Sequence, residues 1–169
     1  MAYYTHEERI RFAREVLAEK RLTQNAYRRH RGYGKEMVCA MSSFGPDIDN
    51  WSHCPASFMP DWLAARIPGW FDCLPEDQIY AHQERLVDLA ERWTVLTAFD
   101  WRDLHRDFIA SCWTYNGFMS RIEKQIRMAE DREAAPYLRE IREQRGPAIT
   151  HDVPIDIPMV SYKEKELVA

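Results

Sequence analysis

Residues 101–126, WRDLHRDFIASCWTYNGFMSRIEKQI, decide the fold class of this 169-residue chain. Apolar side chains recur in this stretch every three or four residues, which is the period of an α-helix. Asn116-Gly117 does not shift that phase, and a glycine inside a helix costs only about 1 kcal/mol relative to alanine. The pattern predicts one long helix over about 101–130, with two helices joined at Gly117 as the alternative. The inward positions are Trp101, Leu104, Phe108, Cys112, Tyr115, Met119, Ile122 and Ile126.

Three further helices are marked by their ends. Thr5-His6-Glu7-Glu8 fits a capping box and predicts a helix over about 6–20. Pro75 followed by two acidic residues predicts a second helix to about residue 93, and Asp100 is placed as the cap of the central helix. Pro136 is expected to start a last short helix that ends at Gly146. The fold class is therefore mainly α, a compact bundle of about five or six helices around a long central helix.

The segment between residues 22 and 46 allows two interpretations. Two glycines one residue apart, Gly32 and Gly34, indicate a loop or hairpin tip. Residues 26–29 and 37–39 are then candidate short strands. The favoured alternative places residues 37–44 in a short buried helix that ends before Gly45-Pro46.

Prolines organise the rest of the chain. Five of the nine prolines fall between Pro46 and Pro75, together with several aromatic residues, so we expect an ordered wrap of short helices packed against the bundle. The best helix there is 61–67, opened by Pro60. The domain organisation is a single helical domain over 1–146 and an extended C-terminal arm over 147–169.

Composition and charge place the protein in the cytoplasm. No apolar run is long enough to span a bilayer, and the first residues lack the layout of a secretory signal. The four cysteines are expected to be buried thiols. The net charge is −4, but residues 1–35 carry nine Lys/Arg against four Asp/Glu, whereas residues 36–100 carry three against eleven. The chain is basic first and acidic in the middle.

Chemistry-bearing motifs are scarce. Closely spaced Cys and His pairs that mark zinc sites are absent, as are phosphate loops and nucleotide fingerprints, so we expect no metal and no cofactor. A small enzyme with a Cys/His-based site remains an alternative, since active sites can be assembled from distant residues. Its candidate residues are Cys54 as nucleophile and His53, His82 and His105 as bases. A non-enzyme is favoured.

Two surfaces are candidate binding sites. A basic loop places cations beside stackable rings, which suits an anionic partner, and it defines a nucleic-acid-binding accessory protein as a second alternative. The overall acidity disfavours that alternative. The loop residues are Tyr27, Arg28, Arg29, Arg31, Tyr33 and Lys35. An acidic and aromatic surface suits protein docking, and its residues are Asp47, Asp49, Trp51, Asp61 and Asp72.

The C-terminal arm is the third candidate. Val153, Ile155 and Ile157 alternate with proline and aspartate, so one side of an extended arm is apolar and suits docking, including homodimer formation. The sequence thus favours an acidic, aromatic-rich interaction protein that occupies a partner's surface as a regulator, adaptor or inhibitor. The acidic middle would allow it to imitate nucleic-acid phosphates, as inhibitors from mobile elements do.

Overall fold

The protein is mainly α-helical, as the periodicity predicts. The computed structural model describes residues 4–29, 34–111 and 115–145. The α-helices are α1 (His6–Ala18), α2 (Asp61–Ala64), α3 (Ile67–Asp72), α4 (Ile79–Arg92), α5 (Ala98–Ser111) and α6 (Tyr115–Arg145). Between them the described residues form four 3₁₀ turns, namely η1 (Ser42–Phe44), η2 (Trp51–His53), η3 (Glu76–Gln78) and η4 (Trp93–Val95). The chain divides into two units, Met1–Asp131 and Arg132–Ala169.

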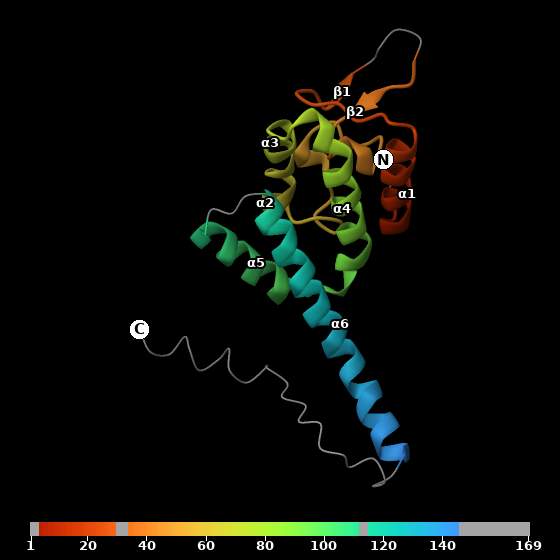
Figure 1. Cartoon of the computed structure of the whole chain (residues 1–169), viewed down its shortest axis with the longest axis vertical. Coiled ribbons are helices and arrows are strands. Elements are labelled where there is room, and N and C mark those ends of the chain that lie inside the picture. The colour runs from red at the N-terminus through yellow and green to blue at the C-terminus, as the bar shows by residue number, and fades with distance from the viewer. Residues whose placement is uncertain (1–3, 30–33, 112–114, 146–169) are drawn as a thin grey trace. The chain divides into compact units, whose positions relative to one another are not determined.

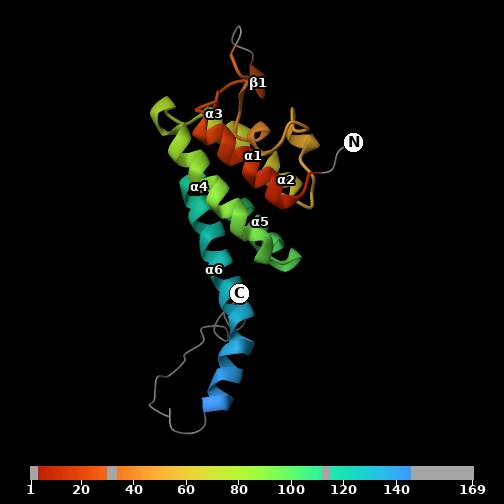
Figure 2. The same cartoon turned by 90° about the vertical axis from the view of Figure 1, so that its right-hand side faces the viewer.

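Helix α1 begins as the capping box predicts. The Thr5 amide donates to the Glu8 carboxylate at 2.7 Å, and the Glu8 amide donates to the Thr5 hydroxyl at 3.2 Å. The helix then buries Ile10, Ala13 and Val16. Helix α1 lies alongside α4 (Figures 1 and 2), where Arg14 contacts Asp88 and Glu91 at 2.7 and 2.9 Å. The basic first segment is therefore partly neutralised by the acidic middle of the chain.

The short strands are present and the favoured short helix over 37–44 is wrong. Strand β1 (Arg28–Arg29) pairs antiparallel with β2 (Met37–Val38). The backbone of Val38 also bonds to the segment after α1, because its amide donates to Arg21 O and its carbonyl accepts from the Thr23 amide. Those ladder bonds keep β2 extended, and only Ser42–Phe44 forms a helical turn before Gly45.

The expectation of one helix over 101–130 is also wrong. Helix α5 ends at Ser111 and α6 begins at Tyr115, and the two run in different directions (Figure 1). Both keep the inward phase, with Leu104 buried on α5 and Met119, Ile122 and Ile126 buried on α6. Apolar residues at helical spacing show which side of a helix faces the core, but two successive helices can share the same spacing. The break is not at Gly117, which lies inside α6.

Proline and cap positions give three smaller corrections. Thr97, not Asp100, precedes α5, and its amide donates to the Asp100 carboxylate at 2.9 Å. Pro136 does not start a helix but lies inside α6. A proline there removes one backbone hydrogen bond and disfavours the helix by about 3 kcal/mol, a cost that the long flanking helix tolerates. The wrap is ordered as expected, although its helix breaks into α2 and α3.

Candidate functional site

The predicted basic loop is mostly bound to its own chain. Arg28 forms an ion pair with Glu36 at 2.7 Å and donates to the carbonyls of Gly45 and Ile48 at 2.8 and 3.1 Å. Lys35 pairs with Glu19. Arg28 therefore fastens the hairpin to the loop before η2, and its guanidinium is not available to grip a phosphate.

The other predicted loop residues differ in what they contact. The Arg29 side chain is exposed and makes no hydrogen bond or ion pair with any residue that the structure describes. The Tyr27 hydroxyl accepts from the Trp51 amide at 3.3 Å, and burial raises the pKa of Tyr27. Arg31 and Tyr33 lie outside the described residues. Of the cations that the structure describes here, Arg29 alone remains open to a ligand.

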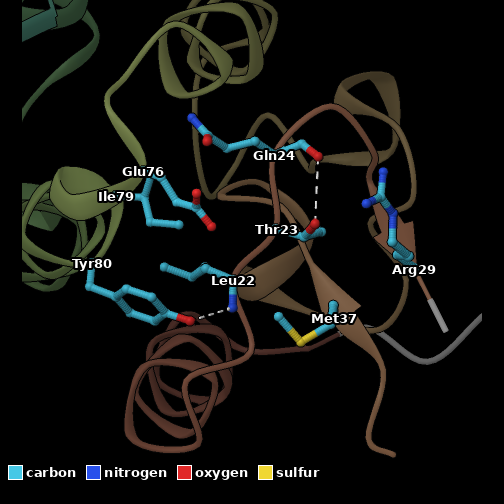
Figure 3. Close-up of a pocket in the computed structure, with 8 residues that line it drawn as sticks. All are labelled: Leu22, Thr23, Gln24, Arg29, Met37, Glu76, Ile79 and Tyr80. Carbon is cyan, nitrogen blue, oxygen red and sulfur yellow. Dashed lines mark hydrogen bonds between the residues drawn. The ribbon is translucent and has the colours of Figure 1, made fainter. Parts of the chain in front are cut away.

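Arg29 borders a pocket of about 480 Å³ (Figure 3). Buried Leu22 and Ile79 give it apolar walls, and the Tyr80 hydroxyl accepts from the Leu22 amide at 3.2 Å. Glu76 supplies a carboxylate, and Figure 3 shows it on the other side of Thr23 from Arg29. The size is in the range of small-molecule sites, and the lining combines apolar walls with the Arg29 cation and the Glu76 carboxylate.

Some residues of the predicted acidic surface are bound to partners within the chain, and others remain exposed. Asp47 accepts two hydrogen bonds from buried Arg9, at 3.0 and 2.8 Å. Burial works to raise the pKa of Asp47, and the Arg9 guanidinium outweighs it, so that pKa lies below its ordinary value. Asp72 accepts from the Asn25 amide at 2.8 Å, and Asp49 pairs with His53. Trp51, which is 40% exposed, and Asp61 remain at the surface.

The Cys/His alternative gains nothing from the geometry. Burial raises the pKa of the Cys54 thiol to about 12, so at neutral pH it is not the thiolate that a nucleophile requires. His105 stacks on Trp62 with ring centroids 4.6 Å apart, while His53 pairs with Asp49. Within the described residues no group of three or more Cys, His, Asp or Glu side chains is placed to hold a metal ion.

A surface that was not among the predicted binding sites lies on α5. Phe99 and Ile109, both on α5, are 68% and 65% exposed. Arg102 and Arg106 lie between them on the same side of the helix, because successive residues turn by about 100° and all four positions fall within about 80°. We call these four residues the outer face of α5. Helical spacing does place these positions away from the buried side of the helix, because they are out of phase with the inward apolar residues.

The opposite side of α5 is held firmly. Asp100 accepts from the Gln125 amide of α6 at 2.7 Å, and Leu104 is buried. Phe108 packs against Trp70 and Phe118 with centroids 5.5 and 5.6 Å apart. Helix α5 therefore presents its outer face from a fixed position.

Comparison with known proteins gives no relative. No protein-family model, curated protein or solved structure matches the chain. Among the described residues, no helix combines the length and apolar character needed to cross a membrane.

Proposed function

We propose that the protein is a non-enzymatic interaction protein that binds another protein through the outer face of α5. The observation that carries this proposal is the exposure of Phe99 and Ile109, 68% and 65%, on one side of one helix. Single exposed apolar residues are ordinary on protein surfaces. Two large ones about 15 Å apart, with arginines between them, have the composition of an interface centre, where aromatic residues and arginine are enriched.

The rigid attachment of α5 supports this proposal. Binding energy is lost when flexible groups must be ordered on association. The bond of Gln125 to Asp100 and the packing of Phe108 fix the helix in the free protein. The outer face therefore needs little ordering before it meets a partner.

The alternatives have weaker support. A Cys/His enzyme would need a thiolate, and the pKa of Cys54 is raised to about 12. A nucleic-acid-binding protein would need free cations on the basic loop, and Arg28 and Lys35 are already paired with Glu36 and Glu19. We accordingly propose a cytoplasmic regulator, adaptor or inhibitor that acts by covering a partner's surface.

The C-terminal arm adds a proposal of its own. Val153, Ile155 and Ile157 lie outside the described residues, and their alternating pattern supports docking onto a groove or a second protomer. Deletion of residues 150–169 should lower either the melting temperature or the molar mass measured by light scattering. Truncation that changes neither these quantities nor partner binding would remove the arm from the proposal.

The proposal for α5 is tested by paired substitutions. Phe99→Ser with Ile109→Ser should abolish the recovery of a stoichiometric partner from lysate and its later binding as a purified protein. Tyr137→Ser is the matched control, because Tyr137 is 66% exposed and lies on α6. Equal partner binding by the double variant and the control would refute the proposal.

A further inference from the structure

We infer that the pocket beside Arg29 binds a small zwitterion whose ammonium and carboxylate groups lie at opposite ends, as in a short peptide with free termini. This site is separate from the outer face of α5, because none of its lining residues belongs to that helix. Its walls come from the segment after α1, the β1–β2 hairpin and the start of α4. The volume of about 480 Å³ lies in the lower part of the range of small-molecule sites, so the ligand is small.

Two unpaired charges of opposite sign line this pocket. Neither the Arg29 guanidinium nor the Glu76 carboxylate has a hydrogen bond or ion pair with any residue that the structure describes. Figure 3 shows Thr23 between them, so the two charges do not meet each other. Arg28 adds no net charge at the basic end, because Glu36 pairs with it at 2.7 Å. A ligand that complements both charges therefore needs an anionic group at one end and a cationic group at the other.

The acidic end keeps its sign when its neighbours are counted. Asp77 follows Glu76 in the chain and is exposed. The Lys20 ammonium lies over the Tyr80 ring, 4.6 Å from its centroid, although Lys20 does not line the pocket. Two carboxylates against one ammonium leave this end negative, so it attracts the ligand's cationic group and repels its carboxylate. The ligand's carboxylate is therefore directed to Arg29.

The rest of the lining includes apolar side chains and is held in place before a ligand arrives. Leu22 and Ile79 are buried, at 3% and 4% exposure. The Leu22 amide donates to the Tyr80 hydroxyl at 3.2 Å, and the Thr23 amide donates to the Val38 carbonyl at 2.9 Å. These bonds join the segment after α1 to α4 and to β2. Because the walls are already ordered, little binding energy is lost in ordering them.

Thr23 favours a peptide among ligands with this charge pattern. Its side chain lines the pocket and the residue is 8% exposed. Within the described structure its hydroxyl makes one long hydrogen bond, which it donates to the Gln24 carbonyl at 3.5 Å (Figure 3). The hydroxyl oxygen is therefore open to accept an N–H group that lies between the two ends of the ligand. A dipeptide carries such an N–H group, and an ω-amino acid of similar length does not.

Four forms of one dipeptide test this inference. Leucyl-leucine is compared with its N-acetyl form, its C-terminal amide and the form blocked at both ends, by NMR titration of the full chain. Each block should weaken binding by about threefold to tenfold, the effect of one partly exposed charge pair. In Arg29→Gln the amide and the free acid should bind equally, and in Glu76→Gln the acetylated and free forms should bind equally. Arg11→Gln and Glu15→Gln, which alter exposed charges outside the lining, should keep both preferences.

Two further ligands identify the source of the zwitterion. The compound ε-aminocaproate has charges at both ends and no central amide, whereas free leucine has both charges on one carbon. Tighter binding of leucyl-leucine than of ε-aminocaproate would support a peptide, and the reverse order would support an ω-amino acid.

Three results would overturn the inference. They are equal binding of all four dipeptide forms, binding of free leucine as tight as that of leucyl-leucine, and absence of binding for every ligand up to about 10 mM, above the millimolar affinity of weak ligands. Preferences that persist in Arg29→Gln and Glu76→Gln would equally exclude these two residues as the recognising groups. Each of these results leaves partner binding by the outer face of α5 untouched, because that face shares no residue with the pocket.

Discussion

Arg9 holds Asp47 by two parallel hydrogen bonds, of 3.0 and 2.8 Å, and the Arg9 side chain is only 2% exposed. It also donates to the Phe44 carbonyl at 3.2 Å. This contact joins α1 to the loop before η2. It brings together a cation from the basic first segment and a carboxylate from the acidic middle of the chain.

Asp47→Ala should destabilise the protein because it leaves Arg9 buried without a counter-charge. We expect a loss of about 2–3 kcal/mol in the free energy of unfolding, below the usual value for a fully buried pair because Asp47 is 32% exposed. Urea unfolding measures it. Asp88→Ala breaks an exposed pair with Arg14 and should cost less than about 1 kcal/mol. Equal losses for both variants would contradict the structural role of Asp47.

Gly45→Ala should disturb the contact between Arg9 and Asp47 by steric overlap. A Cβ atom at Gly45 would lie 2.5 Å from the Asp47 Oδ1 and 2.7 Å from the Arg9 Nη1. The pair must move apart, and we expect a loss of about 1–3 kcal/mol, as for other overpacked sites. Gly69→Ala is the control, since nothing lies within 4 Å of its added carbon, and it should be neutral or stabilising inside α3. A destabilised Gly69→Ala beside an unaffected Gly45→Ala would show that the geometry is wrong.

Phe108→Ala and Phe99→Ala should separate the two sides of α5. Phe108 is half-buried among Trp62, Trp70 and Phe118, so its removal should cost about 2–4 kcal/mol. Phe99 is exposed, and its removal should change stability by less than about 0.5 kcal/mol. Thermal melting monitored by circular dichroism compares the two. A larger loss of stability for Phe99→Ala than for Phe108→Ala would show that the opposite side of α5 faces the core.

Stability should fall as the pH drops below neutrality. Burial lowers the pKa of His6 from its ordinary 6.5, and its Nε2 atom is buried without a hydrogen-bond partner in the described structure. The unfolded chain therefore binds a proton near pH 6.5 that the folded state resists, and stability is lost as the pH falls through the lowered pKa. Burial also lowers the pKa of His82, and Arg85 adds to this.

The His6→Asn variant isolates this effect. Urea unfolding at about pH 7.5 and about pH 5.5 should show a smaller difference for the variant than for the wild type. The pKa of Asp47 lies below 3.8, so that group does not contribute in this window. An identical difference in both proteins would exclude His6 as the source.

Local features were the most predictable from sequence. The capping box of Thr5 and Glu8 depends only on neighbouring residues, and it forms as expected. The buried positions Met119, Ile122 and Ile126 follow from helical spacing alone. The break between α5 and α6 cannot be read from the periodicity, because two helices on one core show the same inward period as a single helix.

The candidate site was less predictable because side-chain partners are chosen by the tertiary structure. Arg28 and Asp47 are residue types that are common at binding surfaces. In the structure, however, Arg28 pairs with Glu36 and Asp47 pairs with Arg9. Their partners lie 8 and 38 positions away, and local sequence does not reveal such pairings. Phe99 precedes the helix predicted over 101–130, and its exposure is defined by the start of α5 at Ala98 and by the packing of the opposite side of that helix.

Photo-crosslinking along α5 tests whether a partner protein binds the outer face of this helix. A photoreactive amino acid is placed singly at positions 99, 102, 106 and 109 of the outer face, and at position 104 on the buried side. We expect one and the same crosslinked protein from all four outer positions and none from position 104. Crosslinking that is equal at all five positions, or that appears from position 104 but not from positions 99 and 109, would contradict it.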